Sequence, residues 1–267
     1  MTPRLQSFRI FIFAPMKYAQ LFFVLALFTA PVLAWSQDDE EPLIPQEDLD
    51  ELLMWMVDGK YEKVLYKAIR YTESDKTDDA PRPYAYMSMA YFRIFESDDP
   101  DFAEDYSNAL KEALKYATKY IKKDKELEHL SEFEEYFDEL RAATISESDM
   151  HIMDEKYTKA KSFYNYLVKL DEEDAGAHLM LGTILWKNRA KRDAGESWEM
   201  AKSLLAEYGD KGLSEVQRNL LRMGVIWTAE TMDAEGMRSD AIEWLNLTAD
   251  YFESDKEFSA VMRSIGE

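Results

Sequence analysis

The sequence predicts an all-α fold of about five helical hairpins followed by a C-terminal capping helix. All eight prolines lie at or before Pro100, so residues 101–267 contain none. The same stretch has few of the glycines that a strand-rich domain of this length uses in its turns. Apolar residues return at three- and four-residue steps, as at Phe133, Phe137 and Leu140. This is the period of a helix with one buried face.

Turn-forming residues divide the pattern into separate helices. Gly59, Asp99-Pro100 and Gly209 fall where one apolar series stops and the next begins. Asp101 and Asp174 are expected to cap helices by accepting backbone N–H groups. No long linker interrupts the series, so residues 47–267 are expected to form one domain. The expected helices are 47–58, 60–73, 82–96, 101–123, 127–146, 153–170, 174–188, 191–207, 213–231, 236–252 and 254–265.

The first 34 residues are predicted to be a signal peptide. They carry three basic residues and no acid, and the apolar run 21–28 is much shorter than the about 20 residues that a membrane span needs. A basic start, a short apolar run and small residues at the exit are typical of a secretory signal. Cleavage is expected after Ala34 or Ser36, with Met16 as the possible natural start. An uncleaved membrane anchor is the alternative.

Residues 35–46 follow as an acidic leader that is expected to stay solvated rather than fold. We therefore expect an exported protein of the periplasm or cell envelope of a Gram-negative bacterium, with no membrane span after cleavage.

The charge balance and the absence of cysteine exclude several classes. The formal net charge is −21, whereas nucleic-acid and anionic-lipid surfaces require clustered Lys and Arg. A nucleic-acid partner is therefore not expected. The chain has no Cys, which rules out disulfides, thiolate catalysis and Cys-ligated metal sites.

An internal repeat lies in residues 157–201. From Ala160 to Ala194 is 34 residues, which is one period of a tetratricopeptide repeat (TPR). The positions that carry the pattern are Tyr157, Ala160, Tyr164, Leu181, Gly182, Ala194, Trp198 and Ala201, with Gly224 and Ala241 further on. The chain resembles the TPR family at these residues. The resemblance implies a right-handed superhelical stack in which small residues let paired helices approach closely. The intervals between the other repeats are irregular, and a generic helical bundle is the alternative.

The resemblance also implies a concave groove lined by the first helix of each repeat. By the family register, the groove candidates are Arg82, Ala85, Met89, Phe92, Arg93, Leu179, Thr183, Trp186, Lys187, Arg218, Leu221 and Val225. This set contains four basic residues and no acid. The hypothesis is that a peptide docks apolar side chains on Phe92 and Trp186 while its carboxylates pair with the basic residues.

No constellation for catalysis, metal binding or cofactor binding stands out. His178 occupies a packing position and is expected to be structural, and no second His or Cys lies at metal-ligand spacing from any of the three histidines. The function predicted is a non-catalytic scaffold or adaptor that binds a protein or peptide partner, without a cofactor. The alternatives are a chaperone or substrate-binding module, which the fourteen Met residues would suit, and an enzyme with a carboxylate pair. The oligomeric state is left open.

Overall fold

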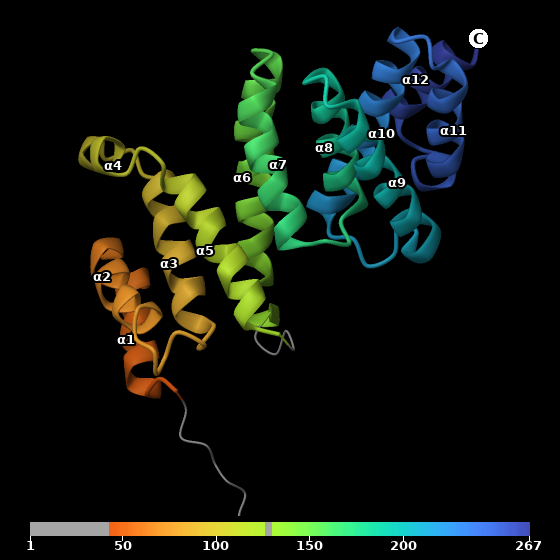
Figure 1. Cartoon of the computed structure of the whole chain (residues 1–267). Coiled ribbons are helices and arrows are strands. Elements are labelled where there is room, and N and C mark those ends of the chain that lie inside the picture. Colours follow the sequence, from red (N-terminus) through yellow and green to blue (C-terminus); the bar gives the residue numbers. More distant parts are fainter. Residues whose placement is uncertain (1–42, 126–129) are drawn as a thin grey trace, which may run out of the picture. The chain divides into compact units, whose positions relative to one another are not determined.

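The computed structural model describes residues 43–125 and 130–267, and every regular element in those ranges is a helix (Figure 1). Twelve α-helices and two short 3-10 helices, η1 (Leu130–Glu132) and η2 (Ala249–Tyr251), are present there. The all-α prediction is confirmed for this part of the chain. The α-helices are α1 (Gln46–Val57), α2 (Tyr61–Thr72), α3 (Arg82–Phe95), α4 (Pro100–Asp105), α5 (Ala109–Lys123), α6 (Glu134–Met153), α7 (Tyr157–Leu170), α8 (Ala175–Lys187), α9 (Lys191–Tyr208), α10 (Glu215–Ala234), α11 (Arg238–Thr248) and α12 (Lys256–Gly266).

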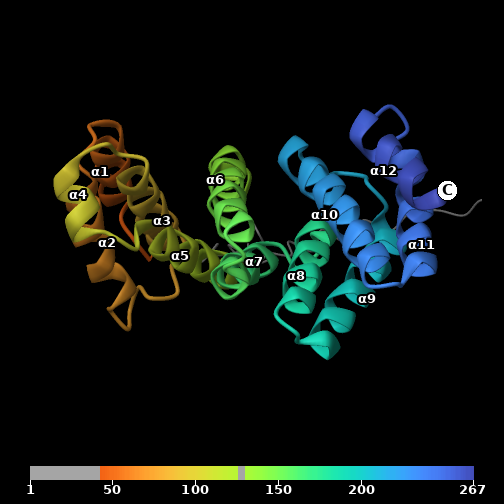
Figure 2. The same ribbon diagram turned by 90° about the horizontal axis from the view of Figure 1, so that it is seen from above.

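Helices that follow one another in the chain pack side by side and antiparallel, as in a stack of helical hairpins. Helix α2 packs on α1 and α3, and α3 packs on α5. Helix α7 packs on α6, α5 and α8. In the C-terminal half, α8 contacts α9 and α10, and α10 contacts α11 and α12 (Figure 2).

Local sequence accounts for most helix ends. Gly59 and Gly209 adopt φ angles of 70° and 66°, which residues with a Cβ rarely adopt, and each ends a helix. Asp174 accepts the Ala177 N–H at the start of α8, as predicted. The prediction for Asp101 is wrong, because Asp99 accepts the Asp101 N–H at the start of α4. Ser214 and Gln217 form a capping box at the start of α10.

The helix expected at 101–123 is two helices in the structure. The chain breaks between α4 and α5 at Tyr106, Ser107 and Asn108, two of which have short polar side chains that compete with helical hydrogen bonds. Tyr106 instead packs its ring edge against Tyr91, with the ring centroids 6.1 Å apart. Helix α4 itself contributes no buried residue.

The helix expected at 127–146 begins and ends later than predicted. Helix α6 runs from Glu134 to Met153 because its buried face continues through Thr144, Ile145 and Ser148. It ends where Glu155 turns to a φ of 55°. The expected start of the next helix at residue 153 is accordingly delayed to Tyr157.

Two clusters of buried apolar side chains form the core, and α8 contributes to both. Eleven of the thirteen residues of α8 are buried, so it has no solvent-facing stripe. Small residues allow this close packing. A Cβ on Gly182 would lie 2.5 Å from the Trp198 ring, and one on Gly224 would lie 2.9 Å from Leu179 Cβ. Both distances are shorter than two carbon atoms tolerate, so glycine is required here.

No helix in the described ranges is long and apolar enough to cross a membrane. The predicted signal peptide 1–34, its cleavage sites and residues 35–42 of the leader lie outside the described residues. In the described end of the leader, Ile44 is buried in the core and Gln46 begins α1, so the expectation of a solvated leader is wrong there.

Candidate functional site

A hollow of about 900 Å³ lies where α6 begins, α7 ends and the chain enters α10. Its walls come from the first half of α6, from the α7–α8 turn at residues 170–173 and from residues 212–217. A more open hollow of about 650 Å³ adjoins it, and Ser131, Glu134 and Asp138 line both. We call the two together the α6 hollow.

Apolar side chains from four parts of the chain line the α6 hollow. Phe137 of α6 and Leu170 at the end of α7 are both buried. Ile121 of α5, Leu130 and Leu213 are partly buried, and Val216 lies in the adjoining part. These segments lie far apart in the sequence and meet here because α6 packs against α7 and contacts α10. We call these apolar lining side chains together the floor of the hollow.

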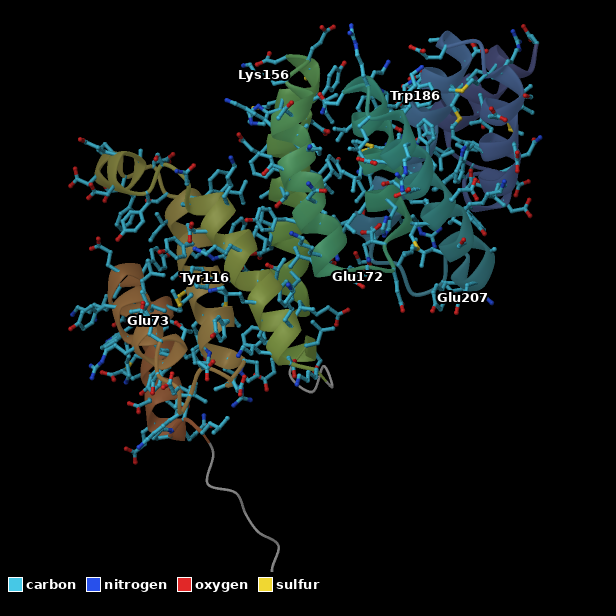
Figure 3. The ribbon with its side chains drawn as sticks, in the orientation of Figure 1. Glu73, Tyr116, Lys156, Glu172, Trp186 and Glu207 are labelled. Carbon is cyan, nitrogen blue, oxygen red and sulfur yellow. The ribbon has the colours of Figure 1, made fainter. Side chains whose placement is uncertain are left out.

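Carboxylates surround this floor. The lining acids are Glu134, Glu135, Asp138, Glu139, Asp171, Glu172 and Glu173, and Arg141 is the one basic residue among the lining side chains. Glu134, Glu135 and Glu172 are exposed, and their carboxylates bond to no other described residue. Figure 3 shows Glu172 at the turn between α7 and α8. The rim is thus strongly negative.

Arg141, another lining residue, joins three aspartates, of which Asp138 and Asp171 also line the hollow. Its Nη1 lies 2.7 Å from Asp138 Oδ1, while the nearest atoms of Asp171 and Asp174 lie 3.7 and 3.6 Å away. Ser214 Oγ donates to Asp138, and Gln217 Nε2 donates to Asp171 at 2.7 Å. This network connects α6, the α7–α8 turn and the start of α10.

Burial raises the pKa of Asp174 to about 6, although the Arg141 charge and the Ala177 N–H oppose that shift. Asp174 is 1% exposed and caps α8. A perturbed carboxyl can mark a catalytic site. Here all three aspartates form ion pairs with Arg141, and Asp174 also caps α8, while its Oδ2 is buried without a hydrogen-bond partner among the described residues. In the described ranges no group of three or more His, Asp or Glu side chains is arranged to hold a metal ion.

The structure separates the predicted groove residues into two groups, and none of them lines the α6 hollow. The first group is buried in the core and cannot line an open groove, so the prediction is wrong for these residues. Other helices cover them: Phe92 of α3 contacts Tyr136 of α6, and Leu179 of α8 lies against Gly224 of α10. The buried group comprises Ala85, Phe92, Leu179, Thr183, Leu221 and Val225, each at most 1% exposed.

The second group is at least partly exposed, and its three arginines are already paired. Arg82 bonds to Glu132 at 2.5 Å, and Arg218 bonds to Asp210 at 2.7 Å. Arg93 bonds to both Glu96 and Glu139. The candidate set itself contains no acid, but acids outside the set pair with all three arginines, so these arginines are not free to hold a partner's carboxylates as the hypothesis requires.

Met89, Trp186 and Lys187 are the remaining groove candidates, and all three are partly buried. The Trp186 ring lies 5.3 Å from the Trp198 ring, with Lys191 Nζ 4.2 Å from its centroid. Trp186 thus packs within the hairpin of α8 and α9.

The repeat-packing candidates lie in the core. Nine of the ten are buried and Tyr157 is partly buried. The nine are Ala160, Tyr164, Leu181, Gly182, Ala194, Trp198, Ala201, Gly224 and Ala241. His178 is also buried, with its Nε2 3.0 Å from the Glu172 carbonyl oxygen, in agreement with a structural histidine.

Sequence reasoning did not find the α6 hollow. The acid clusters at 132–135 and 171–174 were visible, but helix capping accounts for such clusters equally well. Their position beside one apolar floor depends on contacts between segments about 40 to 80 residues apart, which no local pattern contains.

Comparison with known proteins gives no match for this chain, either among protein-family models or among curated proteins. The fold and the site geometry therefore carry the functional argument alone.

Proposed function

We propose that this chain is a non-catalytic protein-binding helical-repeat protein that holds a basic, partly apolar segment of a partner in the α6 hollow. One observation carries the proposal: an apolar floor ringed by carboxylates, in a chain of formal net charge −21. A segment with apolar side chains on one face and Lys or Arg on the flanks complements both features.

Physical chemistry favours such a segment over a purely polar one. If apolar side chains of the partner pack against Phe137, Leu170 and Leu213, apolar surface of both proteins leaves water, and this burial supplies affinity. Lys and Arg would lay their aliphatic stems along the floor and place their charges at Glu134, Glu135 and Glu172. The charges would speed association and select the partner.

The proposal includes a TPR-like right-handed superhelix. Sequential antiparallel hairpins, the 34-residue interval from Ala160 to Ala194 and the glycines at α8 and α10 support it. A scaffold or adaptor role in the envelope follows if the signal peptide acts as expected. Intact mass of the exported protein tests that step, with a start at Gln37 or Trp35 expected.

Peptide binding tests the function directly. The probe is a fluorescein-labelled helical peptide with leucines on one face and lysines on the other, titrated by fluorescence anisotropy. We expect binding that weakens with salt, because exposed charge pairs are screened. Glu134→Gln, Glu135→Gln and Glu172→Gln together should weaken binding by about threefold to a hundredfold, since each removes roughly 0.2–1 kcal/mol.

A matched variant controls for net charge. Glu104, Glu235 and Glu253 are exposed, lie outside the α6 hollow and make no ion pair with a described residue. Changing these three to Gln should leave the affinity within about twofold. Equal weakening in both variants contradicts the proposal. Equal binding of a neutral apolar peptide also contradicts it and favours the chaperone alternative.

A further inference from the structure

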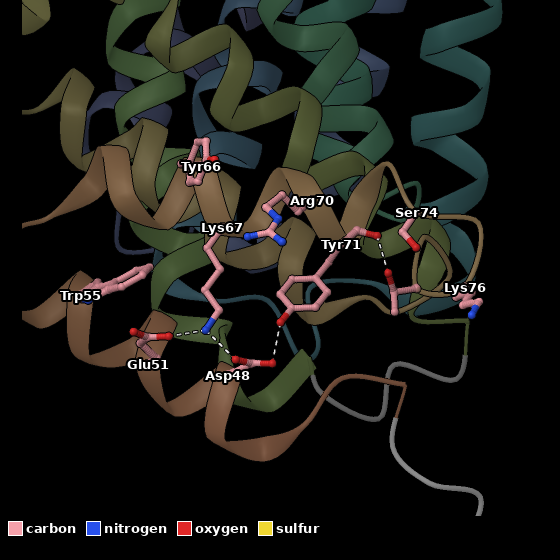
Figure 4. Close-up of a pocket in the computed structure, with 10 residues that line it drawn as sticks. Asp48, Glu51, Trp55, Tyr66, Lys67, Arg70, Tyr71, Ser74 and Lys76 are labelled. Atoms are coloured by element: carbon pink, nitrogen blue, oxygen red, sulfur yellow. Dashed lines mark hydrogen bonds and ion pairs between the residues drawn. The ribbon is translucent and has the colours of Figure 1, made fainter.

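A separate hollow of about 600 Å³ lies between α1, α2 and the loop that follows α2 (Figure 4). Helix α1 contributes Asp48, Glu51 and Trp55, at three- and four-residue steps along one face. Helix α2 contributes Tyr66, Lys67, Arg70 and Tyr71 from the face opposite. We call this the α1–α2 hollow.

Lys67 pairs with both carboxylates of the α1–α2 hollow. Lys67 Nζ bonds to Asp48 Oδ1 at 2.6 Å and also to Glu51. The Tyr71 hydroxyl donates to Asp48 Oδ2 at 2.6 Å. The hydrogen bonds from Lys67 and Tyr71 lower the pKa of Asp48, so this carboxylate stays ionised and engaged.

Two further cations belong to the hollow, and the charge of one of them, Arg70, also helps to lower the pKa of Asp48. Arg70 and Lys76 line it, are exposed and form no ion pair with any residue that the structure describes. Figure 4 shows the Arg70 guanidinium lying between Lys67 and Tyr71. Three cations against two carboxylates leave the hollow positive, in a protein that is otherwise strongly acidic.

Aromatic rings flank these cations. Tyr66 is 72% exposed on the surface of α2, one helical turn before Arg70. Trp55 is partly buried, and Lys67 Nζ lies 5.6 Å from its ring centroid. Exposed Tyr beside Arg is the composition that protein interfaces favour.

We propose that the α1–α2 hollow binds an acidic peptide segment in which a carboxylate side chain is adjacent to an aromatic one. Arg70 and Lys76 pair with the carboxylate, and Tyr66 and Trp55 contact the aromatic ring. The occupant has the opposite charge from the one proposed for the α6 hollow. A single chain with both sites can bring a basic and an acidic segment together.

The test is an anisotropy titration of a labelled peptide that alternates glutamate and phenylalanine. We expect the full chain to bind it, and Arg70→Gln to weaken binding about tenfold, because a charge-assisted hydrogen bond is lost. Tyr66→Ala should weaken binding too, and it removes an exposed ring that the fold does not need. Arg238→Gln is the matched control, because Arg238 is exposed and unpaired on α11 among the described residues.

Unchanged affinity in Arg70→Gln overturns the proposal, as does equal weakening in Arg238→Gln. Equal binding of a peptide with glutamine in place of glutamate overturns it as well, since the carboxylate would then play no part. The probe and the variants differ from those for the α6 hollow, so the two proposals fail independently.

Discussion

Gly176 sets how closely α8 can lie against α10. A Cβ at this position would lie 2.6 Å from Leu221 N and 2.9 Å from Leu221 Cα. Because both are backbone atoms, no side-chain rotation can relieve the clash, and the helices would have to separate.

Gly176→Ala is therefore expected to lower the free energy of unfolding by about 1–3 kcal/mol. Gly195→Ala is the control, because a Cβ there meets nothing within 4 Å inside α9. It should raise stability by roughly 0.5–1 kcal/mol. Urea unfolding midpoints measure both, and similar shifts in the two variants would contradict the close packing of α8 on α10.

Arg141 is the central cation of the polar network at the α6 hollow. Arg141→Met leaves Asp138, Asp171 and Asp174 without their shared cation, and the expected loss is about 3–5 kcal/mol. Arg192→Met removes an ion pair with Glu196 that is exposed on both sides, and it should cost under about 1 kcal/mol. Chemical denaturation of both variants measures the two losses in free energy of unfolding. A loss for Arg141→Met as small as that for Arg192→Met would show that the network contributes little to stability.

Asp174 is expected to make stability depend on pH in a direction unusual for a carboxylate. Its folded pKa of about 6 lies above the ordinary value of 3.8, so the folded state binds the proton more tightly. Its contribution is therefore present below about pH 4 and is lost as the pH rises through 6.

Asp174→Asn keeps a capping side chain and removes this titration. The stability of the Asn variant relative to the wild type should rise between pH 4 and pH 7, by about 1.4 kcal/mol for each unit of pKa difference. Unfolding curves at pH 4, 5, 6 and 7 measure it. A constant difference across that range would show that Asp174 has an ordinary pKa in the folded protein.

At the scale of helices, burial predicts which elements open first. Helix α4 has no buried residue, whereas eleven residues of α8 are buried. Amide hydrogens of α4 should exchange in seconds to minutes and those of α8 should be the most protected, because opening α8 disrupts both core clusters. Hydrogen exchange with mass spectrometry gives these rates. Comparable exchange in the two helices would contradict the described packing.

Most helix boundaries could be predicted from the sequence because their causes are local. Gly59 and Gly209 end helices through their own positive φ angles, and Asp174 caps a helix that starts at the next residue. The break at Tyr106 could not be predicted in the same way, since it depends partly on the contact between Tyr106 and Tyr91. The small residues that the repeat spacing placed in the core are buried. The same spacing did not identify an exposed groove, because six of the groove candidates are buried as well.

At the scale of the whole molecule, exposure and charge pairing depend on which helices meet. Phe92 and Leu221 lie on faces that a neighbouring helix covers, and the acids that pair with Arg82 and Arg93 lie 50 and 46 residues away in the sequence. An acidic chain has its proposed main site lined with acids.

The most direct test of the α6 hollow maps where a basic amphipathic peptide binds. Methyl-labelled protein is titrated with the leucine–lysine peptide, and methyl NMR shifts are followed. We predict saturable shifts at Ile121, Leu170, Leu213 and Val216, with none at Leu53, which is exposed on α1 outside both hollows. Shifts confined to other helices, or no shift at these four methyl-bearing residues, would contradict the proposed function.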